Sequence, residues 1–316
     1  MIHVALLGLA AGDVLGAGVE GADPATASRM LPSLPMPGTR WTDDTQQALV
    51  VARHLLVRGR VDGVALGAEL RAPGLPHRGI GPGFARFLES GAPQPSAGNG
   101  AAMRSAPIGI RSPLPGLVEE AIAAGLVTHA DPRGVAAGVA VAAAVRLAGA
   151  GLDGVDLLVE TADAVTDAEH RLFADHGLRF AAGDRWHTMS EAIRAAVGEL
   201  GATAEAMAES VGRRAAETAD LRLASGTHPY APASVVSALV LAAAASEPEE
   251  AVRAAVRLGG DTDTVAGMVG AIVGVRFGVD RWAWPVPKDD LLLEIGRRLA
   301  AGEGASGIPD VSELIS

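Results

Sequence analysis

Two short runs of the sequence combine carboxylates with hydroxyls at a spacing that could bind a metal ion. They read Thr-Asp-Asp-Thr at 42–45 and Asp-Thr-Asp-Thr at 261–264, and each opens a stretch with the apolar pattern of a helix. Asp and Thr are common helix N-caps, but one capping residue is enough for each helix, so a second carboxylate remains unexplained. Adjacent carboxylates repel one another unless a cation or solvent offsets their charge. Hard oxygen donors suit Mg²⁺, Ca²⁺ or Mn²⁺ rather than Zn²⁺, and this many carboxylates could hold a pair of ions.

Four further segments are candidates for the same site. Glu20 ends a glycine-spaced apolar run and could reach the metals, although a glutamate is more often an exposed surface residue. The glycine-flanked loop 98–104 could hold phosphate through its backbone N–H groups and its arginine, or it could be an ordinary Asn-Gly turn. The glycine-rich stretch 77–83 is a similar candidate. His129 stands alone between predicted helices, where a histidine is more often a structural hydrogen-bonding residue than a catalyst.

The composition limits the function further. The 316 residues carry a net charge of −11, and 25 of the 26 basic residues are arginine. A nucleic-acid groove needs a basic stripe, so the acidic balance argues against one. The absence of cysteine excludes thiol nucleophiles, disulfides and cysteine-ligated zinc.

The apolar N-terminus does not have the pattern of a signal peptide, because it lacks a basic n-region and Asp13 interrupts it. Other apolar runs, near 134–145 and 235–245, are shorter than the roughly 20 residues of a membrane span. We therefore expect a soluble, cytoplasmic protein without a membrane segment.

The elements that must position these residues are helices. Helical periods dominate, and no convincing alternation of apolar and polar residues marks a strand. The sequence predicts one all-α domain over 1–316, with a long loop region at 71–115, where Gly, Pro and Ser are dense and the loop would be functional or disordered. The predicted helices span 2–17, 44–58, 62–70, 116–127, 133–148, 153–166, 188–199, 203–219, 232–245, 248–257, 263–276 and 288–301.

Glycines recur at helical spacing next to both acidic runs. They are Gly8, Gly12 and Gly16 in the first predicted helix, and Gly267, Gly270 and Gly274 in the helix after the second acidic run. Residues three or four apart share one face of a helix, and each glycine there costs about 1 kcal/mol of helix propensity. Close backbone approach between two buried helices would compensate for that cost.

Taken in this order, the residues resemble the ADP-ribosylglycohydrolase family, which includes the dinitrogenase reductase-activating glycohydrolases and the ADP-ribosyl-acceptor hydrolases. The resemblance runs from Gly8 to about Gly278. Each motif is common alone, whereas the ordered set is specific. The matching segments are Gly12-Asp13 with Gly16 and Glu20, Trp41 to Thr45, 79–83, 98–104, Thr128-His129 and Gly259 to Thr264.

The resemblance implies a compact all-α domain of orthogonally packed helices with two Mg²⁺ ions, for which Mn²⁺ could substitute. It implies hydrolysis of the glycosidic bond at ribose C1″ that joins ADP-ribose to a protein side chain or a small acceptor. The implied metal ligands are Thr42, Asp43, Asp44, Asp261, Asp263 and Thr264. The implied substrate-binding residues are Gly81, Gly83, Gly98, Asn99, Gly100, Met103, Arg104 and His129. The catalytic carboxylates would be Glu20, Asp43 and Asp44, with Glu20 or Asp44 performing the proton transfer.

Some features stay open at this point. Segments 84–97 and 168–232 have no clean match and are expected to shape the acceptor end, so the acceptor is not defined. Tyr230, the only tyrosine, could stack on adenine or pack in the core.

Two other functions also remain possible. Residues 261–265 fit the Asp-x-Asp-x-Thr/Val signature of haloacid dehalogenase-like phosphatases, although that signature should follow a buried strand and here follows a predicted helix and Gly-Gly. Alternatively, the protein binds ADP-ribose without hydrolysing it, or serves a structural role.

Overall fold

The computed structural model describes residues 1–73, 75, 77–179, 188–198, 200, 203–218 and 227–315. Within these ranges the regular structure is helical and no strand forms, which confirms the predicted all-α fold. Two isolated β-bridges join Gln94 to His129 and Gly98 to Tyr230. The helices are α1 (Ala5–Gly16), α2 (Pro24–Met30), α3 (Asp43–Arg58), α4 (Gly63–Leu70), α5 (Pro82–Ser90), α6 (Gly100–Met103), α7 (Ala106–Arg111), α8 (Leu114–Leu126), α9 (Pro132–Gly149), α10 (Gly154–His176), α11 (Met189–Val197), α12 (Ala204–Thr218), α13 (Ala231–Ala244), α14 (Pro248–Arg257), α15 (Thr262–Phe277), α16 (Asp289–Ala301) and α17 (Val311–Ile315).

The predicted long loop over 71–115 is wrong, because this stretch contains α5, α6 and α7. Pro82 and Pro107 stand in the first turns of α5 and α7. A proline at the start of a helix loses no hydrogen bond, since the first N–H groups of a helix have no intrahelical partner. These two prolines therefore begin helices, although their presence in a Gly- and Ser-rich stretch favours a loop.

Other boundaries also differ from the prediction. Helix α2 and the C-terminal α17 carry no predicted counterpart, and α10 continues to His176, well beyond the predicted end at 166. The predicted terminal residues 199 and 219 lie outside the described residues, as do 180–187 and 220–226 within the unmatched stretch 168–232.

Helices α1 and α15 pack backbone against backbone, because their glycines face one another. A Cβ atom on Gly12 would lie 1.9 Å from the carbonyl oxygen of Ala266, and one on Gly8 would lie 2.1 Å from that of Gly270. No side chain fits within these distances. Every residue of both helices from Ala5 to Gly16 and from Thr262 to Val275 is buried. The close approach predicted from the glycine spacing is therefore present, and it joins the two ends of the chain in the core.

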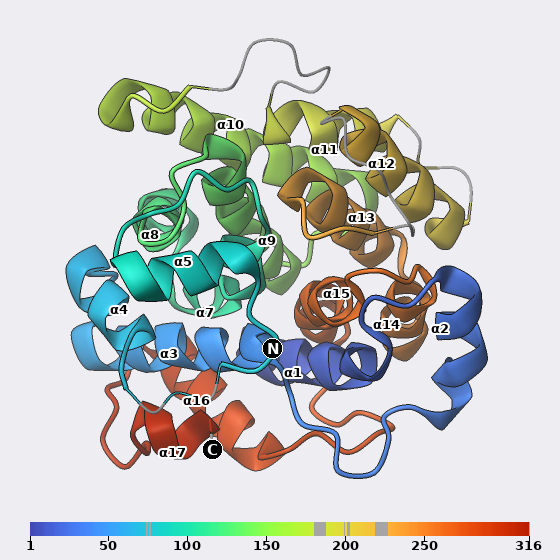
Figure 1. Ribbon diagram of the computed structural model, residues 1–316, viewed down its shortest axis with the longest axis horizontal. Coiled ribbons are helices and arrows are strands. Elements are labelled where there is room, and N and C mark those ends of the chain that lie inside the picture. Colours follow the sequence, from blue (N-terminus) through green and yellow to red (C-terminus); the bar gives the residue numbers. More distant parts are fainter. Residues whose placement is uncertain are drawn as a thin grey trace.

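The other helices surround this pair. In Figure 1, α16 and α17 lie on one side of α1 and α3, while α10 to α13 lie on the other. Helix α9 packs against α15, α13, α8 and α10, and it also contacts the short α6. Nearly all of α9 is buried, and its alanine-rich sequence permits close helix contacts on several faces. This arrangement brings α1, α3, α6 and α15 to one region of the molecule.

One helical stretch among the described residues, Ile2–Val19, is long and apolar enough to cross a membrane, with a mean hydropathy of 1.7. In this structure 78% of that stretch is buried inside the protein, largely in the contact between α1 and α15. Its apolar composition is accounted for by packing in the core.

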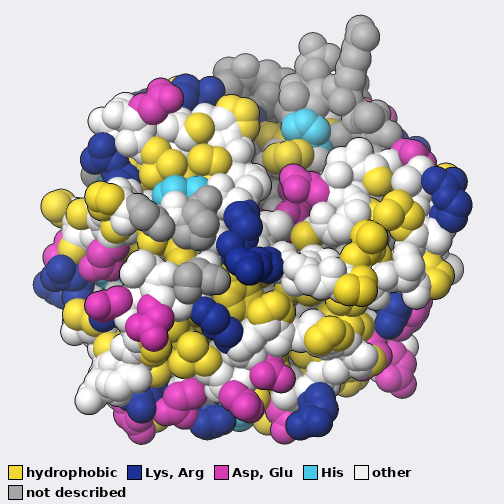
Figure 2. Space-filling view, turned by 60° about the horizontal axis from the view of Figure 1, so that its bottom comes forward, with side chains coloured by type: hydrophobic (Ala, Val, Ile, Leu, Met, Phe, Trp, Pro, Cys, Tyr) yellow, Lys and Arg dark blue, Asp and Glu magenta, His cyan; other side chains and the backbone are white. Residues whose placement is uncertain are grey.

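Charged side chains of both signs are mixed over the face shown in Figure 2. Arginine and lysine side chains stand there in small groups between acidic and apolar ones, and no continuous basic stripe crosses the described part of this face. This arrangement differs from the stripe that follows a nucleic-acid backbone.

The glycine contact gives a stability prediction. Gly12→Ala should lower the free energy of unfolding by about 2–3 kcal/mol, because the added methyl group must push α1 away from α15. Gly116→Ala is the matched control, since this helical glycine faces open space, and alanine there should be neutral or stabilise by up to ~1 kcal/mol. Denaturant unfolding of the metal-free proteins measures both. Equal effects at the two positions would contradict the close contact.

Candidate active site

The first acidic run is held in place by a buried carboxylate from α1. Asp13 is fully buried, and its carboxylate oxygens accept hydrogen bonds from the Thr42 N–H at 2.9 and 3.0 Å. The same carboxylate accepts from the Thr45 N–H at 3.1 Å and from the Thr45 hydroxyl at 2.6 Å. Asp13 thus satisfies N–H groups at the start of α3 and fixes the run that carries Asp43 and Asp44. Sequence reasoning placed Asp13 in a motif but gave it no role in the site.

The second acidic run is shaped by two glycines and by contacts from distant segments. Gly259 and Gly260 have φ values of +70° and +73°, a region that glycine enters without strain. The Gly260 N–H donates to the Ala22 carbonyl at 2.8 Å, which ties the run to the segment after α1. The Thr227 hydroxyl donates to the Gly259 carbonyl and accepts from the Asp261 N–H at 2.9 Å. Backbone conformation and side-chain bonding together direct Asp261 into the site.

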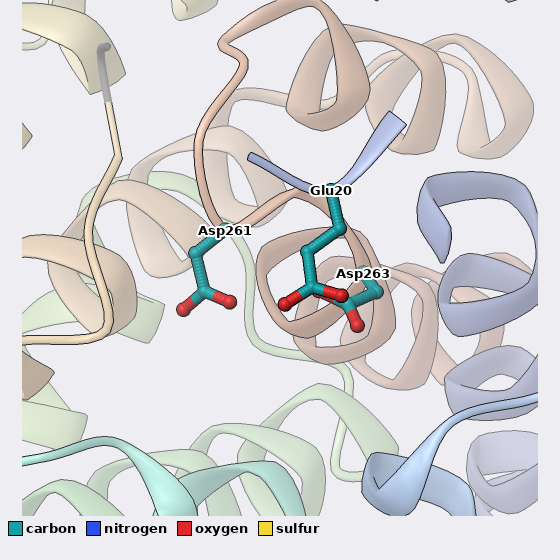
Figure 3. A group of neighbouring side chains, drawn as sticks. All are labelled: Glu20, Asp261 and Asp263. Carbon is teal, nitrogen blue, oxygen red and sulfur yellow. The ribbon is translucent and has the colours of Figure 1, made fainter. Parts of the chain in front are cut away.

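Carboxylates from the two ends of the chain meet here. Glu20, Asp261 and Asp263 each offer an oxygen that lies within 4.8 Å of those of the other two. Figure 3 shows the three carboxylates pointing toward the same side. Asp43 and Asp44 line the same pocket as these three. The structure therefore brings together the two acidic runs that the sequence analysis singled out.

Burial and mutual repulsion raise the pKa values of these carboxyl groups. The pKa of Asp43 is raised to about 7, first by burial and then by the charge of Asp13, with smaller effects of Glu20 and Asp261. Burial raises the pKa of Asp261 to about 6, against the Asn99 hydrogen bond that lowers it. Asp44 and Asp263 have pKa values well above the usual range, because both are buried and other site carboxylates, including each other and Asp261, lie nearby. A cation bound among these groups would remove this electrostatic cost.

The donor set fits a hard divalent cation. Asp44 Oδ1 is buried and has no hydrogen-bond partner among the described residues. A buried carboxylate oxygen without a partner is costly, and a metal ion would satisfy it. The neighbouring donors are carboxylates and threonine hydroxyls, which suit Mg²⁺ or Mn²⁺.

The carboxylates lie at one end of an open pocket with an empty volume of about 820 Å³. All of the predicted site residues except Thr42 line this pocket. Those residues are Glu20, Asp43, Asp44, Gly81, Gly83, Gly98, Asn99, Gly100, Met103, Arg104, His129, Asp261, Asp263 and Thr264. Thr42 lies next to the pocket, and its hydroxyl is 3.3 Å from Asp44 Oδ2.

The loop that begins at Gly98 is bonded directly to the acidic site. The Asn99 side-chain amide donates to Asp261 Oδ2 at 2.6 Å and to the Ser234 hydroxyl at 3.1 Å. The Asn99 N–H donates to the Pro229 carbonyl at 2.9 Å. The loop and the second acidic run therefore hold a fixed relative position.

Several residues of the pocket were not predicted. Gln47 donates to Asp43 Oδ2 at 2.8 Å, and its position one turn after Asp43 in an amphipathic helix was the signal that could have identified it. Phe84 supplies an aromatic wall that no local pattern indicates. Gly79, Pro82 and Thr128 also line the pocket and belong to motifs that the sequence singled out without giving these residues a role, whereas Ser96 and Pro229 were not indicated at all.

Tyr230 is not among the residues that line the pocket. It is buried, its hydroxyl accepts a hydrogen bond from Arg133 at 3.3 Å, and the Arg133 guanidinium lies 5.6 Å from its ring centre. Of the two roles considered for this residue, the geometry supports core packing.

The raised pKa values give a prediction for the metal-free protein. A carboxyl group whose pKa rises on folding stabilises the native state at low pH, and this stabilisation is lost as the pH rises through the folded-state value. Asp43 and Asp261 have folded-state pKa values of about 7 and about 6, against an ordinary value of 3.8, so that loss extends from about pH 4 to about pH 7. Metal-free protein should therefore lose stability between pH 5.5 and 8.

Asp44→Asn removes one repelling charge and should raise the free energy of unfolding at pH 8 by about 1–2 kcal/mol, since one pKa unit corresponds to ~1.4 kcal/mol.

Denaturant unfolding with a chelator at the two pH values tests this. Added Mg²⁺ should stabilise the wild type more at pH 8 than at pH 5.5, because ions compete with protons for the same oxygens. The repulsion would be contradicted if the free energy of unfolding of the metal-free wild type rose from pH 5.5 to pH 8, and rose by more than that of Asp44→Asn.

Comparison with known proteins identifies the family of this chain. The sequence profile of the ADP-ribosylglycohydrolase family matches residues 2–308. A solved structure described as an "ADP-ribosylglycohydrolase-related protein complex" shares 26% identity and has a TM-score of 0.60, with coverage of 95% of this chain and 97% of that chain. A search of curated proteins found no match. Because the family profile covers nearly the whole chain and the fold agrees, the chain belongs to the ADP-ribosylglycohydrolase family.

Proposed function

We propose that this protein is a magnesium-dependent hydrolase that cleaves the glycosidic bond at ribose C1″ between ADP-ribose and an acceptor, and releases free ADP-ribose. The observation that carries the proposal is the meeting of two acidic runs, from opposite ends of the chain, at one end of an 820 Å³ pocket. Membership of a glycohydrolase family supports the reaction class.

The proposed metal ligands come from the two acidic runs. They are Thr42, Asp43, Asp44, Asp261, Asp263 and Thr264. Bound Mg²⁺ would orient ribose hydroxyls and polarise a water molecule, which is the chemistry that such ions supply in hydrolases. The buried oxygen of Asp44 without a partner supports a ligand role for that residue.

Glu20 is the better placed of the two carboxylates considered for proton transfer. Glu20 is exposed as a residue, whereas Asp44 is only 3% exposed. Partial burial of the Glu20 carboxyl group raises the pKa of Glu20 above its usual value. A carboxyl group that reaches both solvent and the pocket can take a proton from water or give one to a leaving group, as glycoside hydrolysis requires. Its closeness to Asp261 and Asp263 also allows it to bind a metal between turnovers.

The remaining wall of the pocket would hold the rest of the ligand. The segments 81–83 and 98–100 present backbone and small side chains, which allow a diphosphate to approach closely. The neutral His129 and the ring of Phe84 complete this part of the wall.

The phosphatase alternative loses its structural basis. Its signature requires a buried strand before the aspartates, whereas Asp261 follows α14 and a Gly-Gly turn, and no strand occurs in the described parts of the chain. Binding without hydrolysis remains the second candidate, and the substrate experiment below separates it from catalysis.

The first prediction from this proposal concerns the metal. Dialysis against a chelator should abolish turnover, and Mg²⁺ or Mn²⁺ should restore it, because the carboxylates cannot position the ribose without a cation. Asp263→Asn should reduce the rate by at least about 100-fold while the metal-free protein stays folded, since a metal-assisted barrier depends on the intact ligand set. The exposed Glu119→Gln is the control and should keep full activity. Full activity in a verified metal-free sample would exclude the proposal.

The second prediction concerns the product. Incubation with acceptors ADP-ribosylated on arginine, on serine or on a small acetylated group should release intact ADP-ribose from at least one of them. Chromatography should detect no AMP and no inorganic phosphate, because the bond broken is glycosidic. Phosphate release at a comparable rate would favour phosphatase chemistry, and binding of ADP-ribose without turnover of any acceptor would favour the non-catalytic function.

A further inference from the structure

A continuous series of buried side chains links the first acidic run to the wall of the pocket. Gln47 donates to Asp43 Oδ2 at 2.8 Å, and Arg104 Nη1 donates to Gln47 Oε1 at 3.0 Å. Arg104 Nη2 donates to the Thr128 hydroxyl oxygen, which lies 2.8 Å from His129 Nδ1. All five side chains are buried, with Arg104 only 1% exposed. We refer to Gln47, Arg104, Thr128 and His129 as the buried series.

Both Nη groups of Arg104 already donate to protein acceptors. Its Nη1 also donates to the Gly100 carbonyl at 2.8 Å, and its Nη2 to the Ala124 carbonyl at 3.4 Å. Its Nε is buried and has no partner among the described residues. Burial lowers its pKa only to about 10, so the side chain remains a cation at neutral pH. A phosphate in the pocket could not bond to either Nη group without displacing these contacts, so the usual two-pronged arginine–phosphate contact does not fit.

The contact between Thr128 and His129 can run in two directions, which differ in the hydrogen position on His129. Arginine has donors and no acceptor, so the Thr128 oxygen must accept from Arg104. We assign the 2.8 Å contact to a bond in which the hydroxyl donates its own hydrogen to His129 Nδ1. A histidine that accepts at Nδ1 and is neutral carries its hydrogen on Nε2. Burial and the Arg104 charge lower the pKa of His129 to about 3 and keep it neutral, against smaller raising effects of Asp131 and of backbone hydrogen bonding to Gly98 and Gly125.

The Nε2 edge of His129 faces the pocket loop. A Cβ atom on Gly100 would lie 3.5 Å from His129 Cε1 and 3.8 Å from Nε2, and both residues line the pocket. The absence of a side chain at Gly100 leaves this edge accessible from the pocket.

We propose that Arg104 and Thr128 are positioning residues, which hold His129 as a neutral donor with its hydrogen on Nε2, directed at an oxygen of the diphosphate bound beside the Gly98–Gly100 loop. This inference rests on the proposed function for the identity of the ligand, but not for the state of His129. It gives Arg104 an indirect role in place of a phosphate contact. It also links ligand binding to the acidic run, because Gln47 joins the same series to Asp43.

Thr128→Val tests the proposal, because valine keeps the shape, removes no charge and takes away only the hydroxyl. Thr128→Ser, which keeps the hydroxyl, is the matched rescue variant. Nitrogen-15 NMR of ¹⁵N-histidine-labelled protein reports the tautomer, with the His129 signal assigned by its loss in His129→Asn. Calorimetry with ADP-ribose and Mg²⁺ reports binding.

We expect the wild type and Thr128→Ser to show the neutral Nε2–H form of His129 at pH 7, and Thr128→Val to show the Nδ1–H form or a mixture. The Kd for ADP-ribose should rise about tenfold in Thr128→Val, the effect of about one lost hydrogen bond, and less than about twofold in Thr128→Ser. Arg104→Lys keeps the charge but not the planar fork, and should resemble Thr128→Val.

Two results would overturn the proposal. One is an Nδ1–H form in the wild type. The other is that Thr128→Val and Arg104→Lys both bind ADP-ribose with the Kd of the wild type. That result would mean that the charge of residue 104 matters directly and its bond to Thr128 does not. Failure of the wild type to bind any ADP-ribose would instead exclude the proposed function, and the tautomers of the wild type and Thr128→Val would still decide how His129 is held.

Discussion

The backbone contact between α1 and α15 is the constraint on which the rest of the site depends. Glycines on both helices remove the side chains that would separate them, so that carbonyl oxygens lie where Cβ atoms would otherwise stand. Asp13 lies on the first helix and Asp263 at the start of the second, and Gly16 packs directly against the backbone of Asp263. Glycine lowers helix propensity, and the burial of both helices in the core offsets this cost. The same contact places two acidic segments, more than 200 residues apart in sequence, around one pocket.

Because these segments lie close together, their carboxylates repel one another, and the described part of the protein supplies no cation that bonds to them. Six carboxyl groups, those of Asp13, Glu20, Asp43, Asp44, Asp261 and Asp263, interact in a mostly buried region, and the nearest buried cation, Arg104, bonds to neutral acceptors. Hydrogen bonds satisfy Asp13 fully and Asp261 partly, but they leave Asp44 Oδ1 without a partner in the described structure. Repulsion between these carboxylates favours the binding of a divalent cation, because the ion removes the repulsion and meets ligands that are already oriented.

Orientation within the pocket comes from residues that do not themselves need to meet a ligand. Asp13 fixes the first acidic run, Thr227 and Asn99 fix the second, and Arg104 with Thr128 fixes His129. These five residues come from four separate segments, and each of them bonds to a group that lines the pocket or lies beside it. Outer hydrogen bonds of this kind set the direction of metal ligands and donors, which limits the reorganisation needed when a ligand binds.

The sequence by itself determined the all-helical fold, the two acidic runs, the glycine faces and the family, because each of these is a local pattern of residue types or an ordered set of such patterns. It also identified almost every residue that lines the pocket at its acidic end and at loop 98–104. It did not reveal the helices within 71–115, because prolines in first turns look the same as prolines in loops. Only the tertiary structure decided that Asp13 caps the first acidic run, that Tyr230 packs in the core and that Arg104 is enclosed by protein acceptors. Those roles depend on which distant groups lie within hydrogen-bonding distance, and that is fixed by helix packing rather than by spacing along the chain.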